Sequence, residues 1–258
     1  WSKLKELWQN HELIGLLAWR DIRVRYAQTL IGFAWAILNP LINLLLLSFV
    51  FNRVAGVSTE EVPALIYGAA GLVGWTFFAE GMSKSGESLL ANQNMVQKIY
   101  FPRLALPLSA VLSSVPDLLI SLFMVVFFML AYGYFELGNC WGLLFLLPLL
   151  MIAAVTAGVW ISALTIRFRD FRFITPVILR LGLFLVPIAY PVTQVPEVYQ
   201  PVYFLHPVAG LVEGLKWSLL NTSIPPHEIW YGLPVLLITF FTGIRFFNRV
   251  SDHAADYL

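Results

Sequence analysis

The sequence predicts an all-α polytopic membrane protein. We expect six transmembrane helices, an amphipathic N-terminal helix at the membrane surface, and short helices at the outer surface before the last span. Composition is the first reason, since 59% of the 258 residues are hydrophobic and only 12% are charged. A soluble domain carries about twice that charged share, because it must cover its core with polar groups. The second reason is arrangement, since the apolar residues gather in runs long enough to cross a bilayer.

The six spans are predicted from length and charge. A helix rises about 1.5 Å per residue, so about 20 mostly apolar residues cross a hydrocarbon core of about 30 Å. Runs that meet this condition occupy residues 31–51, 62–79, 104–135, 141–166, 173–190 and 229–247. Asp117 interrupts the third run and Arg180 the fifth. Intramembrane charges are usually paired or face water, so these two could pair with each other, or Arg180 with Glu80.

The positive-inside rule sets the orientation. Basic residues in short flanking segments favour the cytoplasmic side. With the N-terminus inside, nearly all Lys and Arg residues of the flanks fall in the cytoplasm, and only Arg53 and Lys216 fall outside. We therefore expect both termini in the cytoplasm and one membrane domain over residues 1–258, with spans 1 to 5 within 31–190 and span 6 at 229–248.

Two segments are not expected to cross the membrane. Residues 1–28 mix Trp1, Trp8 and Trp19 with charges, which is typical of a helix lying on the cytoplasmic membrane surface. Residues 191–228 are moderately apolar and rich in proline, and we expect short helices half-buried at the outer surface.

Several classes of chemistry are not expected. The segment GMSKSGES at residues 81–88 lacks the spacing and the Gly-Lys pair of a phosphate-binding loop, so the chain is not expected to hydrolyse nucleotide itself. The four histidines are scattered and Cys140 is the sole cysteine, which argues against a metal site or a disulfide framework. A net charge of +1 gives no field that would draw the chain to nucleic acid. No serine–histidine catalytic motif is apparent, so no catalytic centre is expected. The polar start WSKLKELWQNHEL does not resemble a cleavable signal peptide.

Four sequence blocks carry a resemblance to a known family. They are RDIRVRYAQTLIGFAWAILNPL at 20–41, KIYFPRLALPL at 98–108, RFRDFRFITPVILRLGLFLVPIAYP at 167–191 and HPVAGLVEGLKWSLLN at 206–221. In this order and spacing they resemble the permeases of ABC-2 type polysaccharide exporters, which include O-antigen, capsule and teichoic-acid permeases. The tail HAADYL departs from the family's usual ending near F-A-D and indicates some divergence there.

The resemblance implies a half-transporter in the bacterial cytoplasmic (inner) membrane. Two copies would pair with two copies of a separate ATP-binding subunit, which would hold ATP and Mg, while this chain itself would hold no cofactor. A glycan on a polyprenyl-pyrophosphate carrier would pass through a channel between the two permeases. The re-entrant segment at 206–221 would lie on the outer side. Coupling to the ATPase would use a cytoplasmic helix whose key residues are Asn92, Met95, Lys98, Ile99, Tyr100, Phe101, Pro102 and Arg103.

Two further sets of residues have both a general and a specific interpretation. Arg20, Arg23 and Arg25 are either positive-inside anchors or an entry site for the carrier pyrophosphate, which guanidinium groups bind well. Aromatic residues are either interface belts or a channel lining on which sugar faces stack. The aromatics in the spans expected to form the channel are Trp35, Tyr67, Trp75, Phe78 and Tyr190.

The exposed apolar block at 95–103 likewise has two interpretations, a membrane-surface helix or a knob docked into the ATPase. Two other functions stay open beside polysaccharide export. One is an ABC-2 exporter of a small molecule or lipid, and the other is a membrane-embedded glycan-modifying enzyme. A purely structural scaffold would leave the apolar residues Ile99, Tyr100 and Phe101 without a purpose.

Overall fold

The computed structural model describes residues 10–27, 33–54, 56, 62–135, 138–222 and 227–251, and all regular structure in these ranges is helical. The long elements are α2 (His11–Ala27), α3 (Phe33–Ser48), α4 (Ala64–Ala91), α6 (Ala105–Leu112), α7 (Val115–Ala131), α8 (Leu143–Arg167), α9 (Phe171–Leu185), α11 (Pro207–Leu220) and α12 (Gly232–Ser251). The short elements are η1 (Phe49–Val54), α5 (Gln93–Lys98), η2 (Cys140–Gly142), η3 (Val192–Gln194), η4 (Glu197–Tyr199), α10 (Gln200–Tyr203) and η5 (His227–Tyr231).

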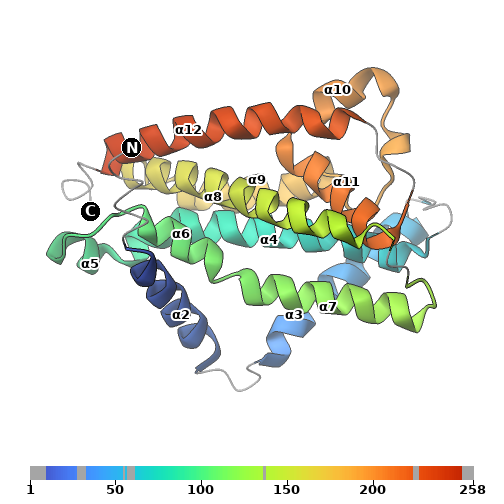
Figure 1. Ribbon diagram of the computed structural model, residues 1–258, viewed down its shortest axis with the longest axis horizontal. Helices are drawn as coiled ribbons and strands as arrows, with labels where there is room; N and C mark the ends of the chain where they lie inside the picture. Colours follow the sequence, from blue (N-terminus) through green and yellow to red (C-terminus); the bar gives the residue numbers. More distant parts are fainter. Residues whose placement is uncertain are drawn as a thin grey trace.

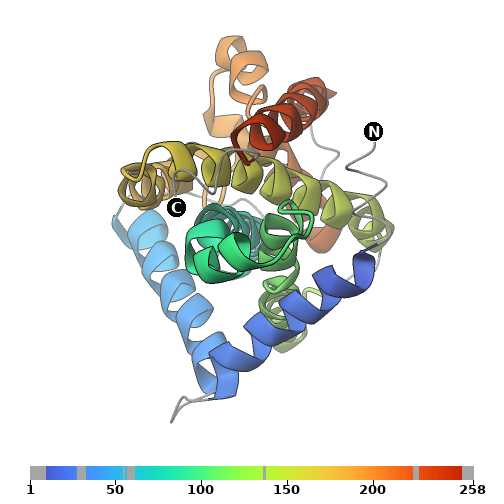
Figure 2. The same cartoon turned by 90° about the vertical axis from the view of Figure 1, so that its left-hand side faces the viewer.

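Helices α4, α7, α8, α9 and α12 lie roughly side by side along one axis, whereas α2 runs obliquely to it (Figure 1). Seen along that axis, α4 occupies the middle with α2, α3, α8 and α9 around it, and α12 packs on the outer side of α8 (Figure 2). Helix α4 contacts α3, α6, α7, α8, α9 and α11. Its buried face is rich in glycine and alanine, which lets neighbouring backbones approach closely. One close approach is at Gly71, where a Cβ atom would overlap the carbonyl oxygen of Ile188.

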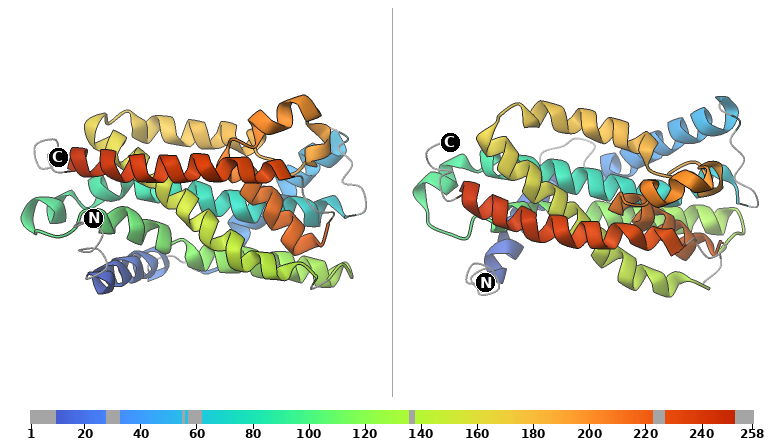
Figure 3. Two further views of the ribbon diagram at one scale, coloured as in Figure 1. Left: turned by 45° about the horizontal axis from the view of Figure 1, so that its top comes forward. Right: turned by 90° about the horizontal axis from the view of Figure 1, so that it is seen from above.

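The two ends of the bundle differ. The start of α2, the end of α12 and the protruding α5 lie at one end, and α10 and α11 lie toward the other (Figure 3). This arrangement is consistent with the predicted placement of the basic flanks at one end and the 191–228 segment at the opposite end.

Helices occur at each of the predicted runs in the expected order, although α4 continues past residue 79 to Ala91. Three of them are long and apolar enough to cross a membrane: Ala105–Ala131, Cys140–Arg167 and Ile229–Ser251. A shorter apolar helix covers Ile37–Phe51. The structure thus confirms an all-helical protein with three clear spans.

Two predicted runs are interrupted. The third divides at Ser113 and Ser114 into α6 and α7, and Pro116 follows in the first turn of α7, where its missing N–H costs no hydrogen bond. The fifth ends as a helix at Leu185, because Pro187 favours an extended conformation for Val186 (φ −95°, ψ 143°).

The two segments outside the runs are partly as expected. Helix α2 covers the second half of residues 1–28, whereas residues 1–9, with Trp1 and Trp8, lie outside the described residues. Trp19 is exposed on α2, and Leu17 is buried. Helix α11 is packed more deeply than the predicted half-buried helices. Gly214 lies against Leu146 of α8, where an added Cβ would come within 3.0 Å of the leucine side chain.

Candidate functional site

A hook of residues 92–103 extends beyond the end of the bundle that carries α5 (Figures 1 and 3). It begins where α4 ends at Ala91 and leads into α6. At its tip, the side chain of Tyr100 is 93% exposed and that of Ile99 is 60% exposed. Exposed apolar side chains next to each other indicate a surface that another molecule covers.

The base of the hook is fixed by packing. Val96 is buried in a small core with Leu89 of α4, Leu106 of α6 and Phe247 of α12, and Met95 and Phe101 pack against this core. The remaining predicted coupling residues divide between the two parts: Lys98 is exposed, while Asn92, Pro102 and Arg103 are half-buried. The base of the hook therefore belongs to the packed end of the bundle, and its tip is exposed.

The three α2 arginines have different surroundings. Arg20 forms an ion pair with Asp21 at 2.8 Å, and its Nη2 donates to Asn92 Oδ1 at 2.9 Å. Arg23 is exposed, and Arg25 forms an ion pair with Asp117. Two of the three predicted pyrophosphate-binding residues are thus engaged with the protein, and α2 is joined by side chains to both the hook and α7.

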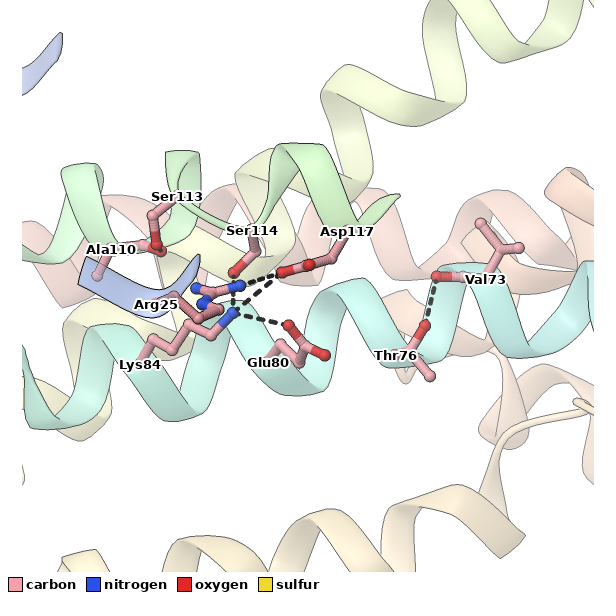
Figure 4. A network of polar contacts seen from close by, with 9 residues as sticks. All are labelled: Arg25, Val73, Thr76, Glu80, Lys84, Ala110, Ser113, Ser114 and Asp117. Atoms are coloured by element: carbon pink, nitrogen blue, oxygen red, sulfur yellow. Dashed lines mark hydrogen bonds and ion pairs between the residues drawn. The ribbon is translucent and has the colours of Figure 1, made fainter. Parts of the chain in front are cut away.

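A charged network connects α2, α4 and α7 at the break between α6 and α7 (Figure 4). Lys84 Nζ lies 2.7 Å from Glu80 Oε2, 3.0 Å from Ser114 Oγ and 3.5 Å from Asp117 Oδ2. With Arg25 on the other side of Asp117, the network holds two cations and two carboxylates. We refer to Arg25, Glu80, Lys84, Ser114 and Asp117 as the charged network.

Neither of the two pairings considered from the sequence, Arg180 with Asp117 or Arg180 with Glu80, forms among the residues that the structure describes. Asp117 pairs with Arg25 and Lys84, and Glu80 pairs with Lys84. Arg180 is exposed on α9 and forms no ion pair with either carboxylate in the described part of the chain. The pairing with Arg25 was missed because α2 was expected to lie on the membrane surface, away from the spans.

Most of the aromatic residues predicted to line the channel are buried within the protein. Tyr67, Trp75 and Phe78 are buried, with the Trp75 ring against Gly182 of α9, whereas Trp35 is 57% exposed. Tyr190 is half-buried, stacks on Phe51 with ring centroids 6.2 Å apart, and shares a 3.0 Å hydrogen bond with the Tyr203 hydroxyl. Trp35 is therefore the most exposed of the five aromatic residues predicted to line the channel.

A buried lysine at the other end of the bundle was not predicted as a site residue. Lys216 of α11 is 1% exposed, lies 2.6 Å from Glu213 Oε2, and donates to the Tyr67 hydroxyl at 2.7 Å. Two opposite charges three residues apart in an apolar helix were a signal for such a pair. As for other ligand chemistry, no group of three His, Cys, Asp or Glu side chains suited to hold a metal occurs in the described ranges.

Comparison with known proteins places these features in a family. The family model described as ABC-2 type transporter matches residues 12–220. The chain is 27% identical over 254 residues to the O-antigen export system permease protein RfbA of Klebsiella pneumoniae, covering 96% of this chain and 95% of the relative.

Two further relatives come from other organisms. The polysialic acid transport protein KpsM of Escherichia coli is 23% identical over 229 residues, covering 88% of this chain and 87% of the relative. The capsule polysaccharide export inner-membrane protein CtrC of Neisseria meningitidis is 24% identical over 259 residues, covering 97% of this chain and 95% of the relative. These matches confirm the resemblance carried by the four sequence blocks. The chain belongs to the membrane-spanning family of ABC-2 type transporters.

Proposed function

We propose that this chain is the membrane-spanning half of an ATP-driven exporter of a polyprenyl-pyrophosphate-linked polysaccharide. The observation that carries the proposal is similarity along nearly the whole chain to permeases for O-antigen, polysialic acid and capsule polysaccharide. Two copies form a channel in the bacterial inner membrane, and two ATP-binding subunits drive it. ATP and Mg belong to those partner subunits.

The hook is the proposed contact with the ATPase. Its tip offers Tyr100 and Ile99 to a partner, and its base joins the end of α4 to the start of α6. Because Val96 anchors the base in the packed core, a push on the tip moves α4 and α6 instead of bending a loop. This combination of an exposed tip and a fixed base supports a coupling role.

The proposed topology has six spans with both chain ends in the cytoplasm. On this topology Gln97 of α5 is cytoplasmic and Tyr199 of η4 is external, and both are exposed. After Cys140→Ser, we expect Tyr199→Cys to react with a membrane-impermeant maleimide in intact cells. Gln97→Cys should react only after permeabilisation. Labelling of Gln97→Cys in intact cells would refute the orientation.

The carrier pyrophosphate is proposed to enter beside α2. Arg23 is exposed, whereas Arg20 and Arg25 contact Asp21, Asn92 and Asp117. A pyrophosphate would therefore meet Arg23 first, and would reach the other two by competing with carboxylates. Guanidinium groups suit this task because they bind phosphate through paired N–H donors.

The channel lining is proposed to begin with Trp35. Trp75 would face a passage only if α9 moved away from α4, since Gly182 of α9 lies against its ring. Tyr67 is instead held against Lys216 of α11, and Phe78 is buried. Tyr190, half-buried beside Phe51, would lie near the outer end of the passage.

Co-purification tests the proposal. The tagged chain is co-expressed with the ATP-binding protein encoded beside it, extracted in mild detergent, and analysed for stoichiometry and ATP hydrolysis. We expect a complex with two copies of each subunit. A chain that emerges alone under gentle extraction would contradict the half-transporter and would favour a membrane-embedded enzyme.

A further inference from the structure

Helix α9 carries a charged side chain in the middle of an apolar segment. Arg180 is exposed, and no hydrogen bond or ion pair joins its side chain to another group in the described ranges. From Phe173 to Leu185 it is the one charged residue of the helix. Charged side chains within membrane helices are costly and almost always face protein or water, so the surroundings of Arg180 in the assembled protein need an explanation.

Both membrane surfaces are distant from Arg180. Gly182, two residues further along α9, lies against the Trp75 ring of α4, so Arg180 is level with the uncharged part of α4. Toward the cytoplasm, the next cation of α9 is Arg172, about 12 Å away along the helix. Toward the outside, α4 continues from Trp75 to Ala64, about 16 Å, without a charge. Snorkelling to a surface therefore does not account for Arg180.

Helix α9 uses one of its faces to pack on the bundle. It lies at the edge of the bundle (Figure 3) and packs mainly on α4 and α8. Residues three or four apart share one face of a helix. Thr175 is buried, Leu179 packs against the main core, and Gly182 lies against Trp75, so these three residues mark the packing face.

The rest of α9 forms two exposed faces of different chemistry. Each is a set of four exposed residues that repeat at helical spacing. The first, which we call the aliphatic face, consists of Ile174, Ile178, Leu181 and Leu185. The second, which we call the arginine face, consists of Phe173, Val177, Arg180 and Phe184.

The two faces suit different surroundings. The aliphatic face has no polar side chain and can lie against lipid tails without leaving a donor unpaired. The arginine face cannot do so, because the five N–H donors of the guanidinium would find no acceptor in hydrocarbon. In an assembly of several subunits the arginine face therefore lies toward a water-filled space.

The side chains of the arginine face match the chemistry of a phosphate-linked sugar. A guanidinium binds phosphate oxygens through paired N–H donors. Phe173 lies about 10 Å before Arg180 along the helix and Phe184 about 6 Å after it, and the two rings are 69% and 59% exposed. Exposed rings offer flat apolar surfaces on which the C–H faces of sugars can stack.

We propose that the arginine face of α9 lines the export passage and that Arg180 binds the carrier pyrophosphate while it crosses the membrane. The inference rests on the proposed function and adds a binding site between the α2 arginines and the outer side. A pyrophosphate loses its hydration in the apolar layer, and a fixed cation at that depth offsets the loss. Phe173 and Phe184 hold the first sugars beside it.

Cysteine labelling tests the orientation of α9. Val177 and Ile178 are consecutive and exposed, so they share a depth and differ in face. After Cys140→Ser, Val177→Cys and Ile178→Cys are each produced with the ATP-binding subunit and treated with a water-soluble methanethiosulfonate in the presence of ATP. We expect Val177→Cys to react roughly tenfold faster or more, because the thiolate is the reactive form and hydrocarbon keeps the thiol protonated. Equal rates, or no reaction at either position, would overturn the orientation.

Export by the complex in inside-out vesicles tests the role of the charge. Arg180→Gln should lower the rate of ATP-driven export roughly tenfold or more, since a charge-assisted hydrogen bond to the pyrophosphate is lost. Arg180→Lys keeps the charge and should export within about threefold of the wild type. ATP hydrolysis without cargo should be the same in all three. Wild-type export by Arg180→Gln would overturn the phosphate role, and loss of the permease dimer in that variant would assign Arg180 to the contact between copies.

The two tests separate this inference from the proposed function. If the wild-type complex exports no glycan with ATP, the proposed function fails, and the Val177→Cys and Ile178→Cys rates still test the orientation of α9. If the wild type exports but the two cysteines react equally, the arginine face alone is refuted. If Arg180→Gln does not insert, Arg180→Cys decides: aminoethyl methanethiosulfonate, which restores a cation, should restore export, and the sulfonatoethyl reagent should not. Equal export after both reagents would overturn the proposal.

Discussion

Removing the ring of Tyr100 should weaken the ATPase contact without destabilising the permease. The side chain is 93% exposed, so nearly all of its surface is available to a partner. Burying about 200 Å² of aromatic surface at about 25 cal/mol per Å² corresponds to an upper bound of about 5 kcal/mol. Ordering of the side chain and incomplete burial reduce this to about 2–3 kcal/mol, the usual range for an interface hot spot. We therefore expect Tyr100→Ala to weaken binding of the ATP-binding subunit by roughly 30- to 160-fold.

The assay is the affinity of the purified ATP-binding subunit for the immobilised permease in detergent, together with thermal unfolding of the permease alone. The melting temperature should hardly change, because substitutions at exposed sites usually alter stability by less than about 0.5 kcal/mol. Tyr199→Ala is the matched control, since Tyr199 is 65% exposed in η4 of the opposite segment. Equal affinities for wild type and Tyr100→Ala would refute the docking argument. An affinity loss shared by Tyr199→Ala would also refute it.

Two further predictions concern packing. Lys216→Met should destabilise the protein by about 2–4 kcal/mol, because it leaves the half-buried Glu213 carboxylate, 16% exposed, without its cation. Adding Glu213→Leu should restore most of the loss in a double-mutant cycle of unfolding in detergent, and a purely additive double mutant would contradict the pairing. Gly71→Ala should cost about 1–3 kcal/mol through overlap with the Ile188 backbone. Gly68→Ala, whose Cβ would lie 3.7 Å from Leu44, should be tolerated, and equal melting temperatures for both variants would contradict the close α4 contact.

The spans were predictable because membrane insertion depends on local composition. Uncharged runs of about 20 residues need a helix wherever they lie in the chain. The helices therefore fall on the predicted runs, and α8 at Leu143–Arg167 nearly coincides with its run. The interruptions at Ser113–Ser114 and Val186 were missed, although Pro116 and Pro187 mark both, because proline is also tolerated inside membrane helices.

The side-chain partners could not be predicted, because they depend on how distant helices pack. Arg25 and Asp117 are 92 residues apart, and Lys216 and Tyr67 are 149 apart. The sequence identified Asp117 as an unusual charge within an apolar run but gave no correct partner for it. The same limit applies to Trp75, since whether an aromatic faces a channel or a neighbouring helix depends on the packing of α9 against α4.

Transport by the reconstituted complex tests the central proposal most directly. The permease and its ATP-binding subunit are placed in inside-out vesicles with a polyprenyl-pyrophosphate-linked glycan, and ATP is added outside. The measured quantity is the fraction of glycan protected from an added glycosidase. We predict that protection rises with ATP only when both subunits are present, and that Tyr100→Ala abolishes the rise. Glycan that stays accessible with both subunits and ATP present would contradict the proposed function, as would protection that needs no ATP-binding subunit.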